Sequence, residues 1–299
     1  MNFDIVKNRN KFFALSIILI AIGVAAMIFN GVQGKGIFNF DIEFTGGTAM
    51  DINMGKEVSN TDISKAITEV TGQSNPQVQQ VLGTNEVMIK MQSVDSDTRT
   101  KLTDKLKETF GLTDESILSV QDISGSMSGE MQKTAAAAVA IACVAMLIYV
   151  SIRFKDFKMG CCSILALLHD ICIMISFYAV FRIPVNNSFI AALLTVLGYS
   201  INATIVIFDR IRENKGMGRR MELKDMINLS LMQTMRRSLY TSLTTLFAIG
   251  AVYAFGVKSI REFALPMMVG IISGAYSSVL LASSLWYVMI NRKKKAGAR

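Results

Sequence analysis

The sequence predicts an α-helical membrane protein with six transmembrane helices and one extracytoplasmic α+β domain between helices 1 and 2. The chain is 51% hydrophobic and has a mean hydropathy of +0.40, which is more apolar than a soluble domain. Its apolar residues also gather in blocks near or above the ~18–20 residues that a membrane helix needs. These blocks are residues 12–29, 134–152, 159–181, 188–208, 238–257 and 263–290.

The first block resembles the apolar core of a signal peptide, because Lys7, Arg9 and Lys11 precede it. Its apolar run is longer than the ~7–15 residues of such a core, and the segment Phe29-Asn30-Gly31 lacks the small residues of a cleavage site. We therefore expect residues 1–30 to form a cytoplasmic tip and an uncleaved first transmembrane helix.

Residues 31–131 follow this helix and are long enough for one small domain. They hold fifteen Asp and Glu residues against eight Lys and Arg residues. The expected elements are extended segments within 38–54 broken by Thr45-Gly-Gly47, a helix from a Ser59 cap to Val70, strands at 78–82 and 86–92 joined by the turn 83–85, a helix at 96–110 ended by Gly111, and a strand at 117–123.

This order, β-α-β-β-α-β, is that of the ferredoxin-like plan. The segment has no His, no Cys and no phosphate-binding loop, which favours a binding or lever domain over a catalytic one. Residues 124–129, Ser-Gly-Ser-Met-Ser-Gly, then predict a flexible link into the second helix. A link that lets the domain move and a passive connector both fit this composition.

The last five blocks predict a five-helix transmembrane bundle over residues 132–290. Helices 3 and 4, and again helices 5 and 6, are separated by only a few residues, at 182–187 and 258–262, so both pairs are expected to form tight hairpins. Residues 209–237 are expected to form a cytoplasmic loop, and residues 291–299 a basic cytoplasmic tail.

Charge placement predicts the orientation. The loop 209–237 holds eight Lys and Arg residues, the tail holds five, and the tip and the segment 153–158 hold three each. By the positive-inside rule both termini are cytoplasmic, and the even number of predicted helices agrees. Most of the net charge of +8 then reflects topology and not a nucleic-acid partner, and the remainder suits anionic membrane lipid.

The sequence offers no enzyme constellation. It has no Ser/His/Asp grouping, no metal-ligand spacing and no Walker loop, so we expect no catalytic activity, cofactor or metal. The cysteines, Cys143, Cys161, Cys162 and Cys172, all fall in predicted membrane helices, where they are expected to act as small packing residues and not as a disulfide framework.

The fourth block carries a polar stripe. Thr195, Tyr199 and Asn202 sit at i, i+4 and i+7, so they share one helix face. Polar groups are costly in hydrocarbon, so such a stripe is expected to face protein or water. Arg237 opens the fifth block with Thr241 and Thr245 on its face. These six polar positions predict a working surface between helices, although Arg237 also fits a snorkelling interfacial residue.

Asp170 is the charged residue placed deepest within a predicted membrane helix, about 11 residues and roughly 16 Å from the start of that helix. It fits a proton or ion relay, and it equally fits a buried acid that fastens neighbouring helices. His169 precedes it and is expected to face elsewhere, because adjacent residues lie about 100° apart on a helix. Gly270, Ser273, Gly274, Ser277 and Ser278 form a small-residue face for close helix packing.

Several motifs together resemble the SecF family, membrane subunits of the bacterial Sec protein-export machinery. They are Phe40-Asp-Ile-Glu-Phe-Thr-Gly-Gly-Thr48, Leu168-His-Asp170, Gly198-Tyr-Ser-Ile-Asn202 running into Phe208-Asp-Arg-Ile-Arg-Glu-Asn214, and Thr241-Ser-Leu-Thr-Thr245. The resemblance implies half of an RND-type bundle paired with SecD. It also implies association with the SecYEG channel and a YajC-like small subunit, and use of the proton-motive force to assist an exported chain after SecA has acted.

One position departs from the family. Where the family usually has an acidic residue thought to act in proton passage, with an arginine at the position of Arg237, this chain has Ala203. A methyl group cannot bind a proton. Three explanations remain open: the partner supplies the carboxylate, a different ion is used, or coupling has been lost. The ion-pathway candidates are Arg237, Asn202, Asp170, Tyr199, Thr241 and Thr245.

The leading hypothesis is therefore an accessory translocase subunit driven by an ion gradient. A half-transporter of the RND type for small molecules or lipids is a second hypothesis, which the small, acidic, single outside domain disfavours. A non-coupled structural scaffold of the translocase is a third, and Ala203 favours it.

Overall fold

The computed structural model describes residues 4–34, 36–56, 58–73, 76–80, 84–217 and 221–296. It divides the chain into two compact units. We call residues 1–39 together with 137–299 the helical unit, and Phe40–Ala136 the sheet unit. The two units are described separately.

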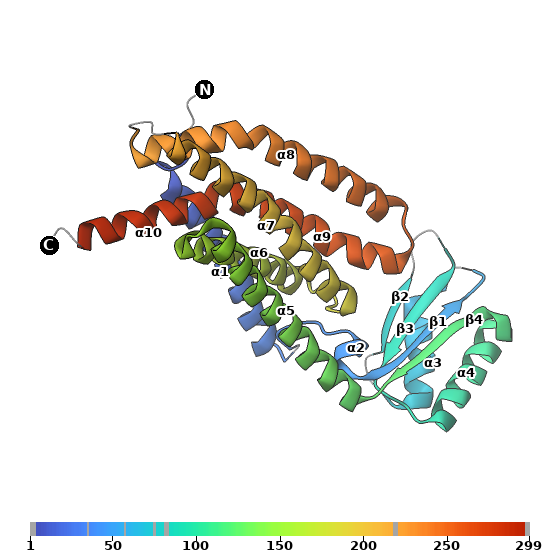
Figure 1. Ribbon diagram of the computed structural model, residues 1–299. Coiled ribbons are helices and arrows are strands. Elements are labelled where there is room, and N and C mark those ends of the chain that lie inside the picture. The colour runs from blue at the N-terminus through green and yellow to red at the C-terminus, as the bar shows by residue number, and fades with distance from the viewer. Residues whose placement is uncertain are drawn as a thin grey trace. The chain divides into compact units, whose positions relative to one another are not determined.

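Within the described residues, six helices are long and apolar enough to cross a membrane (Figure 1), so the protein is a multi-pass membrane protein, as predicted. These helices are α1 (Arg9–Val32), α5 (Gly125–Phe154), α6 (Phe157–Phe181), α7 (Asn187–Gly216), α8 (Leu223–Phe255), and a sixth span that runs through α9 (Lys258–Tyr276), the π-helical segment η2 (Ser277–Ala282) and α10 (Ser283–Ala296).

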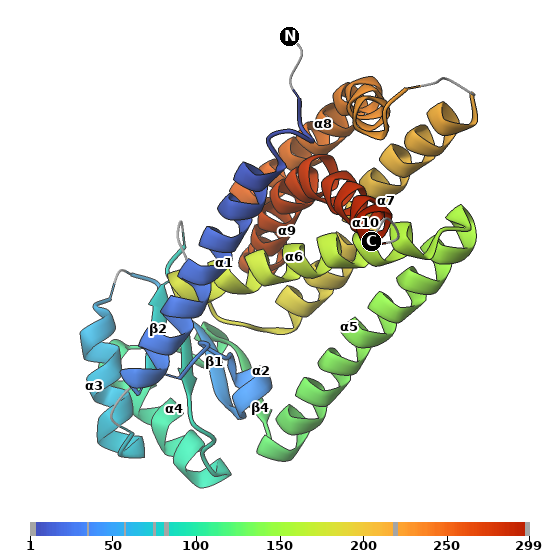
Figure 2. The same ribbon diagram turned by 90° about the vertical axis from the view of Figure 1, so that its left-hand side faces the viewer.

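The helices differ in how much of their surface the chain itself covers. The most apolar window of the sixth span is 61% buried, whereas that of α5 is 6% buried and that of α8 is 11% buried. Figure 2 shows α5 diverging from α6 away from the turn that joins them. The side chains of Ile141, Ile148 and Ile152 on α5 are exposed, which suits contact with lipid or with another membrane protein.

The prediction that residues 209–237 form a loop is wrong, because most of this segment is helical. Helix α7 continues to Gly216 and α8 begins at Leu223. Arg210, Arg212, Glu213 and Lys215 are good helix formers. Ile211 and Ile227 are fully buried. The Nδ2 atom of Asn214 donates to the Oγ atom of Ser230 at 2.8 Å, which joins the two helices beyond the predicted apolar blocks.

The N-terminal turn is tied to this helical hairpin. Ile5 and Val6 are fully buried. The Asp4 carboxylate accepts hydrogen bonds from Lys224 Nζ at 2.5 Å and from Asn228 Nδ2 at 2.9 Å. The hydrogen bond from Lys224 lowers the pKa of Asp4 to about 2, so the carboxylate stays ionised and the contact persists at neutral pH.

Close helix approach depends on glycine at a few positions. A Cβ atom added at Gly23 on α1 would lie 2.7 Å from the Cα atom of Ser176 on α6. A Cβ atom added at Gly270 on α9 would lie 2.4 Å from a methyl carbon of Val196 on α7. Both separations are too short for real carbon contacts, so these helices pack backbone against side chain or backbone, as small-residue faces permit.

Replacing Gly23 by alanine is expected to lower the free energy of unfolding of the helical unit by about 1–3 kcal/mol, because the added methyl group forces α1 away from α6. Gly250→Ala on α8 is the matched control. A Cβ atom there meets nothing within 4 Å, so we expect no loss, and up to about 1 kcal/mol of gain from the helix propensity of alanine. Unfolding of the purified chain in mixed detergent micelles, titrated with SDS, measures both. Equal stability of the two variants would contradict the proposed helix contact.

The sheet unit holds four antiparallel strands in the order β2-β3-β1-β4. Its elements are α2 (Ile42–Thr45), β1 (Gly47–Asn53), α3 (Asn60–Thr71), β2 (Gln77–Gln80), β3 (Glu86–Met91), α4 (Ser96–Phe110), the 3-10 turn η1 (Asp114–Ser116) and β4 (Ile117–Ile123). Helices α3 and α4 supply Ile63 and Leu102 to a core that also contains Met50, Ile52 and Ile89 of the strands.

Most element ends in this unit follow from local chemistry. The Ser59 side chain accepts from the backbone N–H of Thr61 and so caps α3. Helix α4 ends where Gly111 adopts the left-handed conformation, at φ 70°. Residues 81–83, which include the end of the second predicted strand and the first residue of its turn, lie outside the described residues.

Two expectations for this unit are wrong. Residues 42–45 form a helical turn, not an extended segment, because the Asp41 side chain caps it by accepting from the N–H of Ile42. Residues 125–129 are the first turns of α5 and not a flexible link. The Ser124 hydroxyl accepts from the N–H of Met127 at 3.4 Å, so a serine that favours turns also begins this helix.

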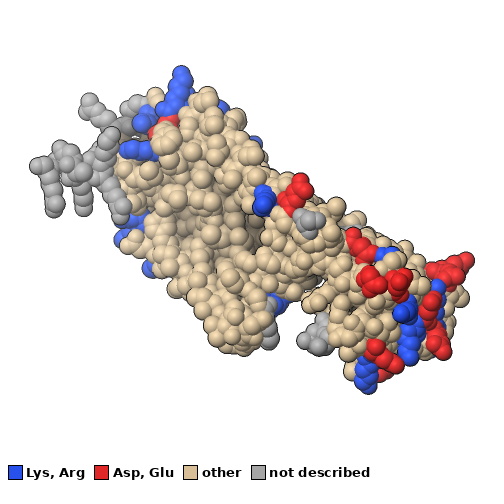
Figure 3. Space-filling view, turned by 90° about the horizontal axis from the view of Figure 1, so that it is seen from below, with Lys and Arg blue, Asp and Glu red and all other residues tan. Residues whose placement is uncertain are grey.

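The charged side chains are distributed unevenly. On the face seen in Figure 3, acidic and basic groups gather on the sheet unit, while the helical unit is largely uncharged except for basic groups toward one end. This pattern is typical of a bundle whose flanks face lipid and whose end lies at a membrane surface.

Candidate functional site

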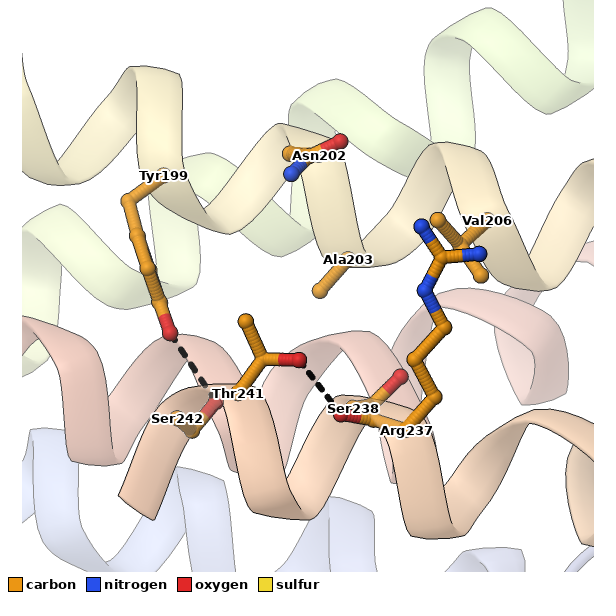
Figure 4. A pocket seen from close by; sticks show the side chains of 8 residues that line it. All are labelled: Tyr199, Asn202, Ala203, Val206, Arg237, Ser238, Thr241 and Ser242. Carbon is orange, nitrogen blue, oxygen red and sulfur yellow. Dashed lines mark hydrogen bonds between the residues drawn. The ribbon is translucent and has the colours of Figure 1, made fainter. Parts of the chain in front are cut away.

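A cavity of about 100 Å³ lies between α7 and α8 (Figure 4). It is lined by Tyr199, Asn202, Ala203, Val206, Arg237, Ser238, Thr241 and Ser242. We call this cavity the α7–α8 pocket. Four of the six candidate residues, Tyr199, Asn202, Arg237 and Thr241, line it together with Ala203, because α7 and α8 run side by side with their polar stripes facing each other.

Tyr199 bridges the two helices at one end of the pocket. Its hydroxyl group lies 3.3 Å from the Oγ1 atom of Thr245 and 3.5 Å from the Oγ atom of Ser242, both on α8. Thr245 thus touches the pocket through Tyr199 without lining it. The threonine hydroxyls of α8 are partly satisfied within their own helix, since Thr241 Oγ1 donates to the Arg237 carbonyl at 2.5 Å.

Arg237 closes the other end of the pocket. Figure 4 shows its guanidinium group extending toward α7 beside Val206, with the Ala203 methyl group pointing into the space between Tyr199 and Arg237. The Arg237 side chain is exposed, and among the residues that the structure describes it has no acidic partner. A permanently charged guanidinium therefore lies in the same pocket as the Ala203 methyl group.

The polar stripe is open to the outside of the helical unit. Thr195, Asn202, Arg237 and Thr241 are all exposed, although they lie on helices apolar enough to cross a membrane. A face of this kind is unfavourable against hydrocarbon. The arrangement can offer hydroxyl, amide and guanidinium groups to an anion or to an ion path at a protein–protein boundary.

Asp170 lies outside this pocket, so the sequence candidates separate into two groups. Its side chain is fully buried on α6. Its Oδ2 atom accepts from Ser200 Oγ at 2.7 Å and from Ser277 Oγ at 2.8 Å, and its Oδ1 atom accepts from Ser273 Oγ at 2.7 Å. Ser200 follows Tyr199 directly, so α7 presents one face to each group, about 100° apart.

The expectation that His169 faces away from Asp170 is wrong. The His169 Nδ1 atom lies 3.2 Å from the Asp170 Oδ1 atom, because the side-chain torsions of both residues turn their polar ends together. The His169 ring also stacks on Tyr276, with centroids 5.9 Å apart.

The sequence reasoning also missed the hydroxyl groups around Asp170. Ser273 and Ser277 were expected to serve packing only, and Ser200 was not singled out. Their signal was present in the sequence: serines at i and i+4 on the sixth span place two donors on one face. The π-helical segment that begins at Ser277 had no such signal, and it lies directly at this cluster, as π-helical turns often do at functional sites.

Comparisons with known proteins find chains of similar sequence. Residues 101–292 match the family described as protein export membrane protein SecD/SecF, C-terminal. The protein translocase subunit SecF of Acidaminococcus fermentans is 36% identical over 98% of this chain and 99% of its own length. The protein translocase subunit SecDF of Bacillus subtilis is 31% identical over 98% of this chain, which corresponds to 39% of that longer protein.

A solved structure has the same fold. The crystal structure of SecDF, a translocon-associated membrane protein from Thermus thermophilus, superposes with a TM-score of 0.85 at 32% identity. The match covers 97% of this chain and 39% of the SecDF chain. These relatives are named as translocase subunits or as translocon-associated, and not as enzymes.

Proposed function

This chain belongs to the SecD/SecF family of protein export membrane proteins, and we propose that it is an accessory subunit of the Sec preprotein translocase. In this proposal it works with SecD, uses the proton-motive force or another ion gradient, and assists the completion of export through SecYEG after SecA has acted. The observation that carries the proposal is the exposed α7–α8 pocket with Arg237, which has no acidic partner among the residues that the structure describes.

A SecD partner accounts for the open polar face. In Bacillus subtilis a segment similar to this whole chain is part of one polypeptide named SecDF, which supports association of this chain with SecD. The polar groups of α7 and α8 cannot face hydrocarbon without a penalty, and a second helical half would cover them. The apolar, largely uncovered surface of α5 leaves further area for lipid or for other translocase subunits, including a YajC-like one.

The α7–α8 pocket suits an ion path at that boundary. Arg237 carries a charge that no described carboxylate of this chain neutralises, and a counter-charge or a bound anion at this face would stabilise it within the membrane. Tyr199, Asn202, Thr241 and Thr245 add hydroxyl and amide groups along the same face, which can pass or coordinate an ion.

The remaining parts follow from charge and fold. Basic segments at the tip, near the turns and in the tail favour both termini in the cytoplasm of a bacterial cell, with the sheet unit outside the inner membrane. An acidic α+β domain there is suited to contact a preprotein in transit and to transmit movement from the membrane helices. The scaffold alternative rests on one observation, the methyl group of Ala203 in the pocket.

The test is co-reconstitution of this chain with its SecD partner in liposomes under an imposed proton or sodium gradient. The proposal expects ion flux that depends on both subunits, and faster completion of preprotein export when SecYEG and SecA are present. If the intact complex supports export equally well with and without either gradient, the ion-coupled proposal is overturned and the scaffold function is favoured.

A further inference from the structure

The cluster around Asp170 lies in the core of the helical unit, on a different face of α7 from the α7–α8 pocket. We propose that His169 and Asp170 form a proton-binding pair, in which His169 Nε2 takes up one proton while Asp170 holds the ring in place. This inference rests on the proposed function for its purpose, namely ion coupling. It goes beyond that function by naming the ion and a binding site.

Asp170 is a junction between three helical elements. Its carboxylate lies on α6, one hydroxyl donor comes from α7, and two come from α9 and the π-helical segment η2. Asp170 and its donors Ser200, Ser273 and Ser277 are all buried. A buried carboxylate is tolerated when hydrogen-bond donors surround it. Because the donors come from α7, α9 and η2, a change in the charge of Asp170 or of the ring beside it alters hydrogen bonds to all three elements.

His169 leaves one nitrogen unused. Its Nδ1 atom faces the Asp170 carboxylate, so in the neutral ring Nδ1 carries the hydrogen and Nε2 has a free lone pair. The Nε2 atom is buried and has no hydrogen-bond partner among the described residues, and the side chain is only 9% exposed. A buried nitrogen without a partner is unfavourable, and in native proteins it often marks a functional group.

The His169 ring lies beside a cavity, although its Nε2 atom is itself covered. His169 lines a space of about 310 Å³ between α1, α6 and α9, together with Ser273 and Tyr276 and with apolar residues. These apolar residues are Leu15, Leu19, Ile173, Phe177, Val269 and Ile272. The lining presents no polar surface and Nε2 is covered, so a proton reaches Nε2 only when residues of this lining move.

The titratable groups that face His169 are few. Within the part of the chain that the structure describes, they are Asp170 on its own helix and Tyr276 on α9. The Tyr276 hydroxyl is already engaged, since it donates to the Phe12 carbonyl of α1 at 2.8 Å and lies 3.3 Å from Ser16 Oγ. Asp170 is thus the acidic group that contacts the His169 ring in the described part of the chain.

The packing favours a proton over a sodium ion. Three hydroxyl oxygens lie 2.7 to 2.8 Å from the carboxylate oxygens, and a Cβ atom added at the neighbouring Gly274 would lie only 3.0 Å from Ser200. A hard cation needs several oxygen ligands around a space of its own, whereas the cavity beside His169 is lined mostly by apolar side chains and does not include Asp170. A proton adds no volume, and its uptake converts a neutral ring beside a carboxylate into an ion pair.

The chain has a single histidine, which makes the test direct. The full chain, labelled with ¹⁵N-histidine and assembled with its unlabelled SecD partner in nanodiscs, gives one imidazole spectrum. We expect a neutral ring with hydrogen on Nδ1 at high pH and protonation of Nε2 as the pH falls. Asp170→Asn is expected to change the midpoint of this protonation, since the charge that faces Nδ1 is gone.

Asp209→Asn is the matched control, because Asp209 pairs with Arg153 outside the cluster and its loss should leave the midpoint unchanged. The inference is overturned if Nε2 of the native chain does not protonate between about pH 4 and 10, or if Asp170→Asn and Asp209→Asn titrate alike. The native titration keeps the test valid even where Asp170→Asn fails to fold.

A flux measurement separates this inference from the proposed function. Gradient-driven flux without any titration of His169 would overturn the proton-binding pair and would support the proposed function. Titration that depends on Asp170, in a complex that shows no flux, would support the proton-binding pair and would overturn the proposed ion coupling. When both hold, His169→Gln is expected to reduce proton flux at least tenfold.

Discussion

Replacing Arg237 by alanine is expected to abolish gradient-driven ion flux and to reduce preprotein export to the level of cells without this chain. Arg237 supplies the only positive charge in the lining of the α7–α8 pocket that the structure describes. Removing one partner of a desolvated charge pair costs about 2–5 kcal/mol, which corresponds to a loss of about 30-fold or more in ion binding. Flux into liposomes and export in a complemented depletion strain measure the effect.

The fold should survive this substitution. The side chain is exposed in the chain by itself and has no acidic partner among the described residues, so alanine removes no internal contact of that kind. Insertion and thermal stability of the variant are therefore expected to match those of the native chain.

Two further variants test whether the effect is specific to the position and the shape of Arg237. Arg236→Ala removes an equal charge from the next, also exposed, position, which points elsewhere on α8, and it should leave flux intact. Arg237→Lys keeps the charge but loses the planar fork, and it should retain part of the flux. Normal export in Arg237→Ala, or an equal defect in Arg236→Ala, would show that the pocket has no special role.

The membrane part of the fold could be predicted because its signals are strong and local. Apolar blocks located all six spans, and a stripe of spacing i, i+4, i+7 placed Tyr199 and Asn202 on one face. The predicted ends of helices α7 and α8 were wrong. Residues 209–216 and 223–237 have no apolar block, yet they are helical because Asn214, Ser230 and the buried Ile211 and Ile227 pack the two helices against each other. Such pairing is a tertiary effect that a single segment does not reveal.

The candidate residues themselves could be found from the sequence, but their grouping could not. Asp170 and Arg237 both stood out as charges on apolar helices, and nothing in their spacing showed that α7 lies between them with Ser200 on one face and Tyr199 on the other. The contact between His169 and Asp170 depends on side-chain torsions, which helix periodicity does not fix. For the same reason the serines of the sixth span looked like packing residues only.

Restoring the missing acid is the second large effect that we expect. Ala203→Asp should raise proton flux through the reconstituted complex by about tenfold, the factor that corresponds to ~1.4 kcal/mol. The Ala203 methyl group points into the same pocket as the Arg237 guanidinium (Figure 4), so a carboxylate on this carbon gains a protonatable group beside a fixed positive charge. Ala203→Asn has nearly the same shape without the proton site, and it should leave flux unchanged.

The double variant decides why this position can be alanine. If Ala203→Asp acts through Arg237, adding Arg237→Ala should cancel the whole gain, since the coupling of two groups in contact is not additive. A native complex that already conducts, and that Ala203→Asp slows, would mean that a partner carboxylate occupies the pocket, because two carboxylates beside one guanidinium repel each other. A silent native complex that Ala203→Asp activates would mean that the path is intact but lacks its acid, and ion coupling at this pocket would have to be withdrawn for the chain with Ala203.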